Sequence, residues 1–495
     1  MINFVCHRWS AVVILAGLLF SDRVGAETTF CRSPDFPQEV ICGKIQRPLN
    51  PTDPNGKKID VHYMVVPSQD RNKLPDAVFL LAGGPGQSAI NAAGFGQALL
   101  NRLNRRRDLV FVDQRGTGRS APLQCPDLDT VQGVPDRESM IRLMRECRAQ
   151  LQSLPYGDLQ YFSTSMAMQD LEAVRLAQGY GAINLVGVSY GTRAGLEYLR
   201  QFPNAVRRLV IDGVVPPDLR VLGADSKIAL DGLFAECAKE SRCNEQYPRL
   251  EERWKSLLAS MPKATQLTHP RLGSPLSITI TRDVLLRLVQ SVLYSSANTA
   301  AIPYALTQAE RGNFSPLVTL SGATSLPGPL GIAYGMHFSV WCGEALARPW
   351  TLPPRDEFEE LSISTYKQVC AEWPRAEIPT AFFNVEKTNS PVLLLSGGID
   401  PVTPTRNGVV VAKALGDKAR HVSVENVGHG LLSHGCVRDV VHRFLNAKTD
   451  DDAVKVDAAC VRQIPRPIAW FAPQEKSVAA AKNQTEVDQK KGGQP

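Results

Sequence analysis

Residues that build metal centres are few in this sequence. Its 495 residues include only eight histidines, which are scattered along the chain, and none of its 11 cysteines forms a C-x-x-C pair. Structural zinc sites and dithiol redox sites usually need closely spaced ligands of this kind. We therefore expect neither a metal ion nor another cofactor.

A strong charge bias is also missing. The formal net charge of +6 and the pI near 8.7 are small for a chain of this length. The densest basic run has no aromatic residues among its arginines, whereas surfaces that bind nucleic acid often combine the two. We interpret this run as a solvated helix end and expect no nucleic-acid partner. Its members are Arg102, Arg105, Arg106 and Arg107.

Long apolar runs without charges or helix breakers are missing after the N-terminus. The N-terminal run, Ala11 to Phe20, follows Arg8 and is too short for a typical membrane-spanning helix. Val24-Gly25-Ala26 then has the small residues of a signal-peptidase site. We predict a signal peptide over residues 1–26, cleaved after Ala26, and a secreted or periplasmic protein without stable membrane insertion. An uncleaved N-terminal anchor is the alternative.

The cysteines that remain after residue 26 number ten, an even count that is typical of disulfide-bonded proteins in oxidising compartments. Spacing does not determine connectivity, but these cysteines fall in sequence as neighbours. We predict pairing between nearest neighbours. The predicted pairs are Cys31 with Cys42, Cys125 with Cys147, Cys237 with Cys243, Cys342 with Cys370, and Cys436 with Cys460.

The pattern of apolar residues predicts an α/β protein with a large helical insertion. Apolar strands that end in Gly-rich loops alternate with helix-like segments, which implies a mostly parallel sheet with helices on both faces. The pattern becomes mainly helical over residues 218–380 and returns to strands at "SPVLLLSGGIDPVTP" and "ARHVSVENVGHG". We predict a core in two parts, 27–217 and 381–473, with a cap insertion between them and a disordered tail over 474–495.

The stretch "INLVGVSYGTRAG" places Ser189 between Gly187 and Gly191, at the end of an apolar strand and before a helix. This is the context of a nucleophile elbow, a strained turn that lifts a serine above the strand end. The flanking glycines are needed because a Cβ would clash with the neighbouring strand and helix. A serine alone is a poor nucleophile, so the chain must also supply a base and an acid.

Asp400 and His429 fit the two remaining roles. Ser, then Asp, then His is the order of a triad in α/β-hydrolases. Each residue follows a predicted strand, at the end of a parallel sheet where active sites collect. The competing residues are His434 as base and Asp212 as acid, while His337 and His421 lie off the expected loops.

The segment "LLAGGPGQSA" supplies a candidate oxyanion hole. Gly83 and Gly84 follow a predicted strand where the fold places one donor amide, and the backbone N–H of Tyr190 would be the second donor. A Gly-Gly-Pro-Gly run by itself would also suit a tight turn. Its position upstream of the elbow and at a strand end favours the functional interpretation.

Five motifs, "GGPGQSA", "DQRGTGRS", "GVSYGT", "GGIDPVTP" and "GHG", occur in this order. Together they resemble the prolyl aminopeptidase and tripeptidyl aminopeptidase family of α/β-hydrolases, and most closely its secreted tripeptidyl aminopeptidase branch. The resemblance covers roughly residues 30–470 and implies Ser189 as nucleophile, Asp400 as acid and His429 as base. Prolyl aminopeptidases usually have histidine where this chain has Ala82, which points away from the cytosolic proline-specific enzymes.

The "DQR" signature precedes a glycine at a strand end. Asp113, Gln114 and Arg115 belong to the family pattern but not to its catalytic set. We favour a buried ion pair or a hydrogen-bonded turn over direct contact with substrate.

An aminopeptidase must bind a protonated α-amine, and desolvating this cation requires a carboxylate partner. Glu344 lies beside Cys342 in the predicted cap, and Trp341 could form an apolar wall next to it. We therefore predict Glu344 and Trp341 as substrate-binding residues. A surface glutamate near a disulfide is an equally good interpretation.

The resemblance implies a secreted serine exopeptidase that removes short peptides or single residues from peptides with a free N-terminus, through an acyl-enzyme. A carboxylesterase or lipase with the same triad is the main alternative, because a fold does not determine its substrate. A catalytically silent binding module is disfavoured because all three triad residues are present.

Overall fold

The computed structural model describes residues 27–125, 135–220, 223, 225–268, 273–322, 331–346, 348 and 353–472. The predicted signal peptide and the predicted tail over 474–495 lie outside these residues. Within the described ranges, no helix combines the length and apolar character needed to cross a lipid bilayer.

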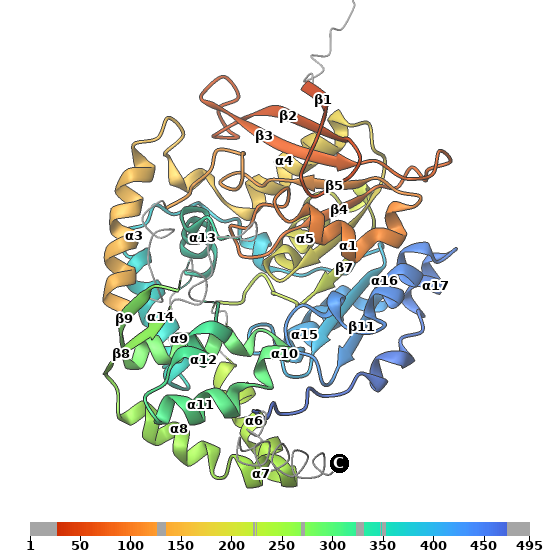
Figure 1. Cartoon of the computed structure of the whole chain (residues 1–495). Coiled ribbons are helices and arrows are strands. Elements are labelled where there is room, and N and C mark those ends of the chain that lie inside the picture. The colour runs from red at the N-terminus through yellow and green to blue at the C-terminus, as the bar shows by residue number, and fades with distance from the viewer. Residues whose placement is uncertain are drawn as a thin grey trace, which may run out of the picture.

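A nine-stranded sheet forms the centre of the upper and right-hand part of the molecule (Figure 1), in the order β1-β2-β3-β5-β4-β6-β7-β10-β11. Neighbouring strands from β5 to β11 in this order pair in parallel, and β1, β2 and β3 add an antiparallel edge. The predicted, mostly parallel α/β sheet is therefore confirmed. The strands are β1 (Glu27–Cys31), β2 (Val40–Pro48), β3 (Lys58–Val66), β4 (Val78–Leu81), β5 (Leu109–Val112), β6 (Ile183–Val188), β7 (Val206–Asp212), β10 (Val392–Gly397) and β11 (Ala419–Val424).

Helices cover both faces of the sheet, which explains why its strands are apolar throughout. In β7, Leu209 and Ile211 belong to the hydrophobic cluster on one face, and Val210 belongs to the cluster on the other. Side chains alternate between the faces of a strand, so a sheet with two covered faces needs continuous apolar strands. The first cluster includes residues of α3 (Arg137–Gln152), α4 (Thr164–Ala177), α5 (Tyr190–Gln201) and α15 (Thr405–Leu415), and the second includes residues of α1 (Ala93–Asn104), α16 (Val437–Asn446) and α17 (Asp450–Val454).

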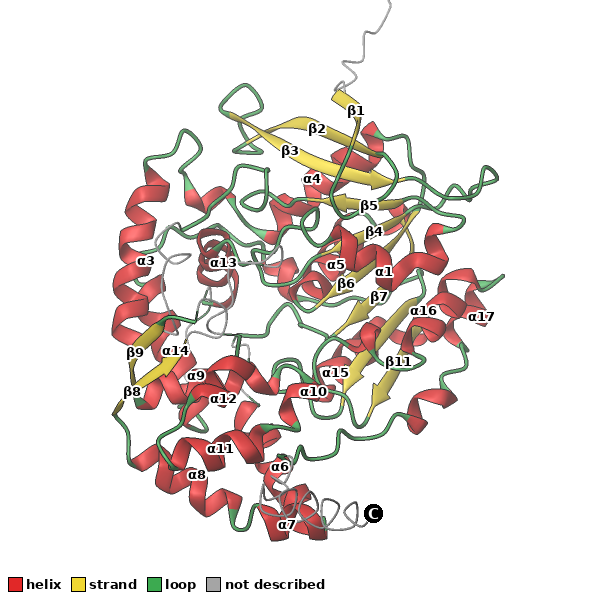
Figure 2. Cartoon of the chain, viewed as in Figure 1, coloured by secondary structure: helices red, strands yellow, loops and turns green. Residues whose placement is uncertain are grey.

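The chain between β7 and β10 forms the helical mass at the lower left of Figure 2. Most of its helices enclose a hydrophobic cluster of their own, which contains Trp254, Leu285 and Phe314. The insertion also holds a short antiparallel hairpin that the apolar pattern did not predict. The elements are α6 (Ser226–Lys239), α7 (Ser241–Gln246), α8 (Leu250–Ala259), β8 (Lys263–Thr268), β9 (Pro275–Ile280), α9 (Arg282–Leu293), α10 (Ser296–Thr299), α11 (Ile302–Glu310), α12 (Ser315–Leu320), α13 (Tyr334–Val340) and α14 (Glu357–Cys370).

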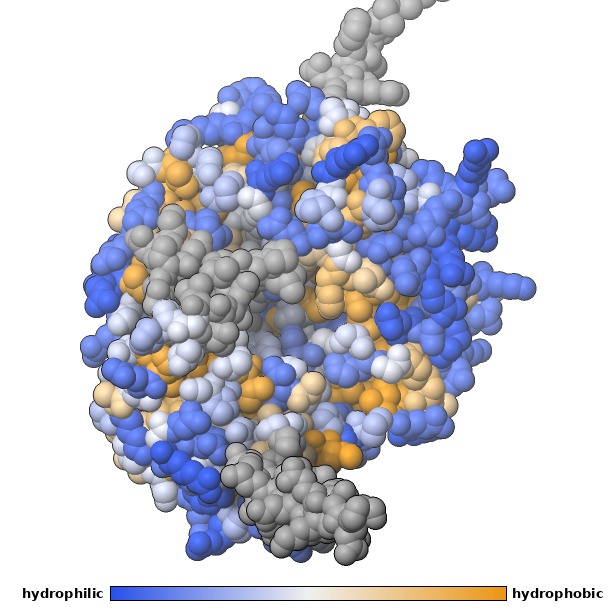
Figure 3. Space-filling model, in the orientation of Figure 1, coloured by the Kyte–Doolittle hydropathy of each residue, from blue (hydrophilic) through white to orange (hydrophobic). Residues whose placement is uncertain are grey.

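Helix α13 of the insertion packs onto the sheet part. Met336, Phe338 and Val340 of α13 belong to the same cluster as the strands and α5. Ala333, just before α13, donates its N–H to the carbonyl of Gly86 at 2.9 Å. Figure 3 shows hydrophobic side chains near the middle of the visible face, between the sheet and the insertion, and hydrophilic ones over much of the rim.

All five predicted disulfides are confirmed. The structure joins each of the ten cysteines after residue 26 to its nearest neighbour in sequence. Such bonds persist in oxidising compartments.

Candidate active site

Ser189 lies in a strained turn between β6 and α5. Its φ of 56° and ψ of −123° fall where side chains are rarely found, a conformation that costs on the order of 1–3 kcal/mol. Two backbone hydrogen bonds hold the turn: the Ser189 N–H donates to the Asp212 carbonyl at 2.8 Å, and the Ser189 carbonyl accepts from the Thr192 N–H at 2.9 Å. The elbow predicted from the sequence is present.

The glycines on either side of Ser189 have the steric role that was expected. A Cβ on Gly187 would lie 2.3 Å from the carbonyl oxygen of Gly191 in α5. A Cβ on Gly191 would lie 2.1 Å from the carbonyl oxygen of Leu81, at the end of β4. Strand, turn and helix can therefore approach this closely only without side chains at these two positions.

Asp400 and His429 lie on the loops after β10 and β11 and contact each other. His429 Nδ1 is 2.8 Å from Asp400 Oδ2. The Asp400 carboxylate also accepts the N–H groups of Val402 and Thr403, at 2.8 and 2.9 Å, and the Thr403 hydroxyl at 2.6 Å. When Nδ1–H donates to the carboxylate, the lone pair lies on Nε2, the arrangement a general base needs.

The surroundings of His429 and Asp400 favour the charged form of both side chains. Burial lowers the pKa of His429, but the adjacent Asp400 carboxylate outweighs burial, and the pKa lies above its ordinary value. Burial raises the pKa of Asp400, yet the His429 charge and the hydrogen bonds from His429 and Thr403 bring it below its ordinary value. The site therefore favours an imidazolium beside a carboxylate, the state formed when a histidine accepts a proton from serine.

Asp212, the competing acid, contacts the backbone after His429. Its carboxylate accepts the N–H groups of Leu431 and Leu432, at 3.0 and 2.9 Å. The side chain is fully buried, and burial raises the pKa of Asp212 to about 6. Asp212 thus supports the His429 loop, whereas Nδ1 of His429 is bonded to Asp400.

The three other histidines considered in the sequence analysis have local partners. His434 Nδ1 lies 3.2 Å from the Gly430 carbonyl, and His421 Nε2 lies 3.0 Å from the Ser396 hydroxyl. His337 is different, because its Nδ1 lies 3.2 Å from the carbonyl of Pro85 in the Gly-rich loop. Burial lowers the pKa of His337 to about 4, so it is neutral at neutral pH.

The Gly-rich loop after β4 lies beside the elbow. A Cβ on Gly83 would be 3.4 Å from the Cβ of Ser189, and the adjacent Gly84 has a φ of +109° that suits glycine. Tyr190 is the first residue of α5, so its backbone N–H has no acceptor within the helix. Gly83 therefore lies against Ser189, Gly84 follows it in the loop, and Tyr190 follows Ser189 at the start of α5.

The "DQR" signature supports this loop. Asp113 accepts hydrogen bonds from the Ser88 hydroxyl at 2.6 Å and from the Ile90 N–H at 3.1 Å. Arg115 forms a two-pronged ion pair with Asp170, at 2.7 and 2.9 Å, in which both side chains are buried. The predicted hydrogen-bonded turn and buried ion pair are confirmed.

Glu344 and Trp341 lie in a π-helical turn that follows α13, and both contact Arg193 of α5. Glu344 Oε1 accepts the Thr164 N–H at 2.8 Å, and Oε2 lies 3.4 Å from Nη1 of Arg193. The Arg193 guanidinium also lies 4.8 Å from the centre of the Trp341 ring. Burial raises the pKa of Glu344, and the Arg193 charge opposes this shift. The carboxylate is fully buried and already has a cationic partner.

Sequence reasoning missed Arg193 and two cap residues near His429. Arg193 follows Tyr190 by three positions, which puts both side chains on one helix face. This spacing could have indicated that the Arg193 side chain lies near the elbow. Tyr294 and Ser296 contact the His429 loop from the insertion, and no local motif marks them. Among the described residues, no group of three His, Cys, Asp or Glu side chains is placed to hold a metal ion.

Comparisons with known proteins agree with this geometry. Residues 76–248 match the family model described as alpha/beta hydrolase fold, and residues 358–460 match the model described as TAP-like protein. The chain is 25% identical to the tripeptidyl aminopeptidase of Streptomyces lividans over 475 residues, which cover 86% of each protein. It is also 25% identical to Carboxylesterase B of Mycobacterium tuberculosis, over 82% of this chain and 84% of that protein.

A third relative is matched over a shorter region. The chain is 31% identical to the serine protease Hip1 of Mycobacterium tuberculosis over 240 residues, 44% of this chain and less than half, 46%, of that protein. Sheet order, elbow and both model matches lead to the same conclusion: the chain is a TAP-like α/β-hydrolase.

Proposed function

We propose that Ser189, His429 and Asp400 form a catalytic triad. The observation that carries this proposal is the 2.8 Å contact between His429 and Asp400, together with the hydrogen bonds by which Asp212 ties the His429 loop to the strained Ser189 turn. In the proposed reaction, His429 takes the hydroxyl proton as Ser189 attacks the substrate carbonyl, then gives it to the leaving group. Water hydrolyses the acyl-enzyme by the same route in reverse.

The amides of Gly83 or Gly84 and of Tyr190 are the proposed donors to the oxyanion. Backbone donors that are fixed before the reaction stabilise developing charge without reorganising. The positive end of α5, which begins at Tyr190, adds to this field.

We infer that the substrate is a peptide with a free N-terminus, from which short peptides or single residues are released. The support is the full-length similarity to a protein named tripeptidyl aminopeptidase. A carboxylesterase activity is the second candidate, because a relative with similar coverage is named Carboxylesterase B. Secretion, to the periplasm or beyond, is inferred from the five disulfides.

Glu344 and Trp341 are the residues predicted to receive the substrate amine and an apolar side chain. The geometry argues against a direct role for Glu344, since a substrate cation would have to displace Arg193 from a buried pair. We therefore infer that any effect of Glu344 on the amine is exerted through the Tyr190–Arg193 turn.

The experiment is a substrate panel on the whole protein. Tripeptide anilides with a free or acetylated N-terminus are compared with short-chain acyl esters. Wild type should prefer the free-amine anilides, and Ser189→Ala should lower kcat by about 10⁴-fold or more. Activity restricted to esters would favour the esterase candidate, and full activity of Ser189→Ala would reject the triad.

A further inference from the structure

Two cap residues contact the loop that carries His429. The Gly428 N–H, one residue before His429, donates to the Ser296 hydroxyl at 2.7 Å, and Ser296 is buried. The Tyr294 ring meets the His429 ring edge to face, with centres 5.5 Å apart. Tyr294 is 38% exposed, so its ring contacts His429 on one side and is open to solvent on another.

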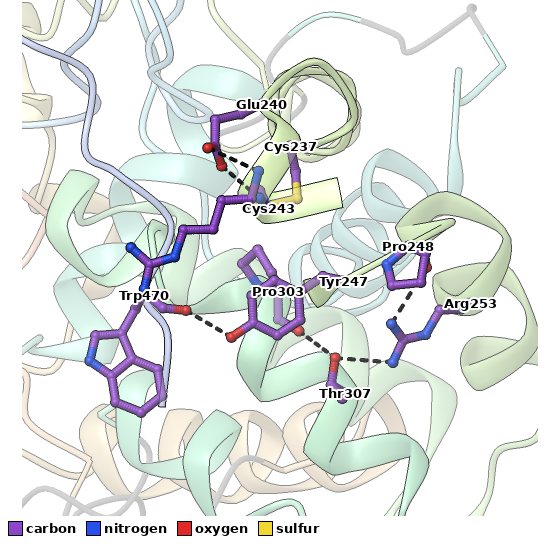
Figure 4. Close-up of a disulfide and its surroundings, with 10 residues drawn as sticks. Cys237, Glu240, Cys243, Tyr247, Pro248, Arg253, Pro303, Thr307 and Trp470 are labelled. Atoms are coloured by element: carbon purple, nitrogen blue, oxygen red, sulfur yellow. Dashed lines mark hydrogen bonds between the residues drawn. A yellow bond between two sulfur atoms is a disulfide. The ribbon is translucent and has the colours of Figure 1, made fainter. Parts of the chain in front are cut away.

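The same cap segment is fixed by the C-terminal end of the described chain. Residues 464–471, here called the C-terminal strap, cross from the sheet part to α6 and α7 (Figure 1). The Trp470 N–H donates to the carbonyl of Ala300 at 2.9 Å, and its ring lies edge-on to Tyr304 at 4.5 Å. The Tyr247 hydroxyl donates to the Trp470 carbonyl at 2.8 Å, close to the Cys237–Cys243 disulfide (Figure 4).

The strap is anchored at both ends. On the cap, the Phe471 ring stacks on Tyr247 at 5.9 Å, and the Arg242 guanidinium lies 4.0 Å from the Phe471 ring centre. On the core, the Asn426 side chain donates to the carbonyl of Ile464 at 3.0 Å, just after the Cys436–Cys460 disulfide. Asn426 lies in the loop between β11 and His429, so the core end of the strap contacts that loop directly.

The contacts with His429 and the contacts with the strap converge on residues 294–304. Tyr294 and Ser296 face the His429 loop, while Ala300 and Tyr304 face Trp470. The short helix α10 joins the two sets, and the Thr299 hydroxyl donates to the Ser295 carbonyl at 2.8 Å within it. One short, hydrogen-bonded helix therefore connects the two sets of contacts.

We propose that cap residues 294–304 position His429, and that the C-terminal strap holds these residues in place. The inference rests on the proposed role of His429 as base. Asp400 and Asp212 hold the His429 loop from the core, and Ser296 and Tyr294 supply contacts from the cap. A base must keep its reactive nitrogen within a fraction of an ångström of its working position, so an insertion that holds it contributes directly to turnover.

The test compares substitutions at both ends of the segment. Ser296→Ala removes the acceptor of the Gly428 N–H and should lower kcat roughly tenfold with a smaller change in KM, because a buried amide loses its partner. Ser296→Thr retains a hydroxyl and should restore most of that loss. Trp470→Ala acts from the remote end and should lower kcat by about three- to tenfold.

Ile468→Ala is the matched control, because Ile468 is in the same strap and 80% exposed. It should keep the wild-type kcat. Circular dichroism and thermal unfolding identify any variant that fails to fold, and folded variants are compared by burst-phase kinetics, which separate acylation from later steps. This inference is overturned if Ser296→Ala and Trp470→Ala have the same kcat as Ile468→Ala. If Ser189→Ala is inactive in the same assay, the proposed triad still stands. An active Ser189→Ala would instead reject the triad.

Discussion

Asp212 links Ser189 to the loop that carries His429. Its carbonyl oxygen accepts the Ser189 N–H at 2.8 Å, while its carboxylate accepts the Leu431 and Leu432 N–H groups at 3.0 and 2.9 Å. A single buried residue thus sets the position of the proposed nucleophile relative to the proposed base. This role requires no contact between its carboxylate and the His429 ring.

Asp212→Asn tests that role. The amide keeps one acceptor but turns an N–H₂ group toward a backbone N–H, so one hydrogen bond is lost and a buried donor is unsatisfied. We expect the free energy of unfolding to fall by about 1–3 kcal/mol and kcat to fall with it, with little change in KM. Urea unfolding and steady-state kinetics measure the two effects. Unchanged kcat with lowered stability would show that Asp212 only supports the fold.

The pH dependence of kcat/KM should reflect the ionisation of His429 beside Asp400. Burial lowers the pKa of His429, but Asp400 outweighs burial and raises it above the usual 6.5. The base must be neutral to act, so kcat/KM should fall as pH drops through a midpoint above 6.5. A midpoint well below that value would contradict the pairing.

Asp400→Asn removes the charge that raises this pKa. The midpoint of the acid limb should move to lower pH, and kcat should fall by about 10⁴-fold, because an amide cannot hold the required tautomer. The pH profile of kcat/KM measured on the variant checks the direction of the shift. A shift to higher pH would show that another group raises the His429 pKa.

Glu344→Gln separates structural from substrate-binding roles. Removing the carboxylate charge leaves Arg193 buried without its ionic partner, which should cost about 3–5 kcal/mol of stability. We expect activity on free-amine and acetylated anilides to fall by the same factor. Glu360→Gln, at an exposed position of α14, is the control and should change neither quantity. A loss confined to free-amine substrates would instead establish Glu344 as the amine ligand.

Gly191→Ala should disrupt the elbow. The new Cβ would lie 2.1 Å from the Leu81 carbonyl, so strand and helix must separate. We expect a loss of about 3 kcal/mol or more and a large drop in kcat. Gly181→Ala is the matched control, because nothing lies within 4 Å of a Cβ there. Wild-type stability in both variants would mean that the elbow does not need glycine.

Local patterns predicted the elbow and the disulfides because each depends on residues close in sequence. Ser189 and its two glycines form one turn, and each disulfide joins neighbouring cysteines. Ser296 and Gly428 are 132 residues apart, and periodicity carries no signal for such a contact. Glu344 was predicted from its neighbours to bind substrate, but its partner Arg193 lies 151 residues away and decides its charge environment.

The order of strands in the sheet has a consequence for biosynthesis. β7 pairs with β10, with Leu209 opposite Val392, and the whole insertion separates them in the chain. During synthesis β7 therefore remains an exposed apolar edge until the insertion has been made and β10 is available. Such edges invite pairing with other chains, and distant strand pairing is slow to form. A fragment that ends inside the insertion would lack Asp400 and His429 as well as the strands that shield β7.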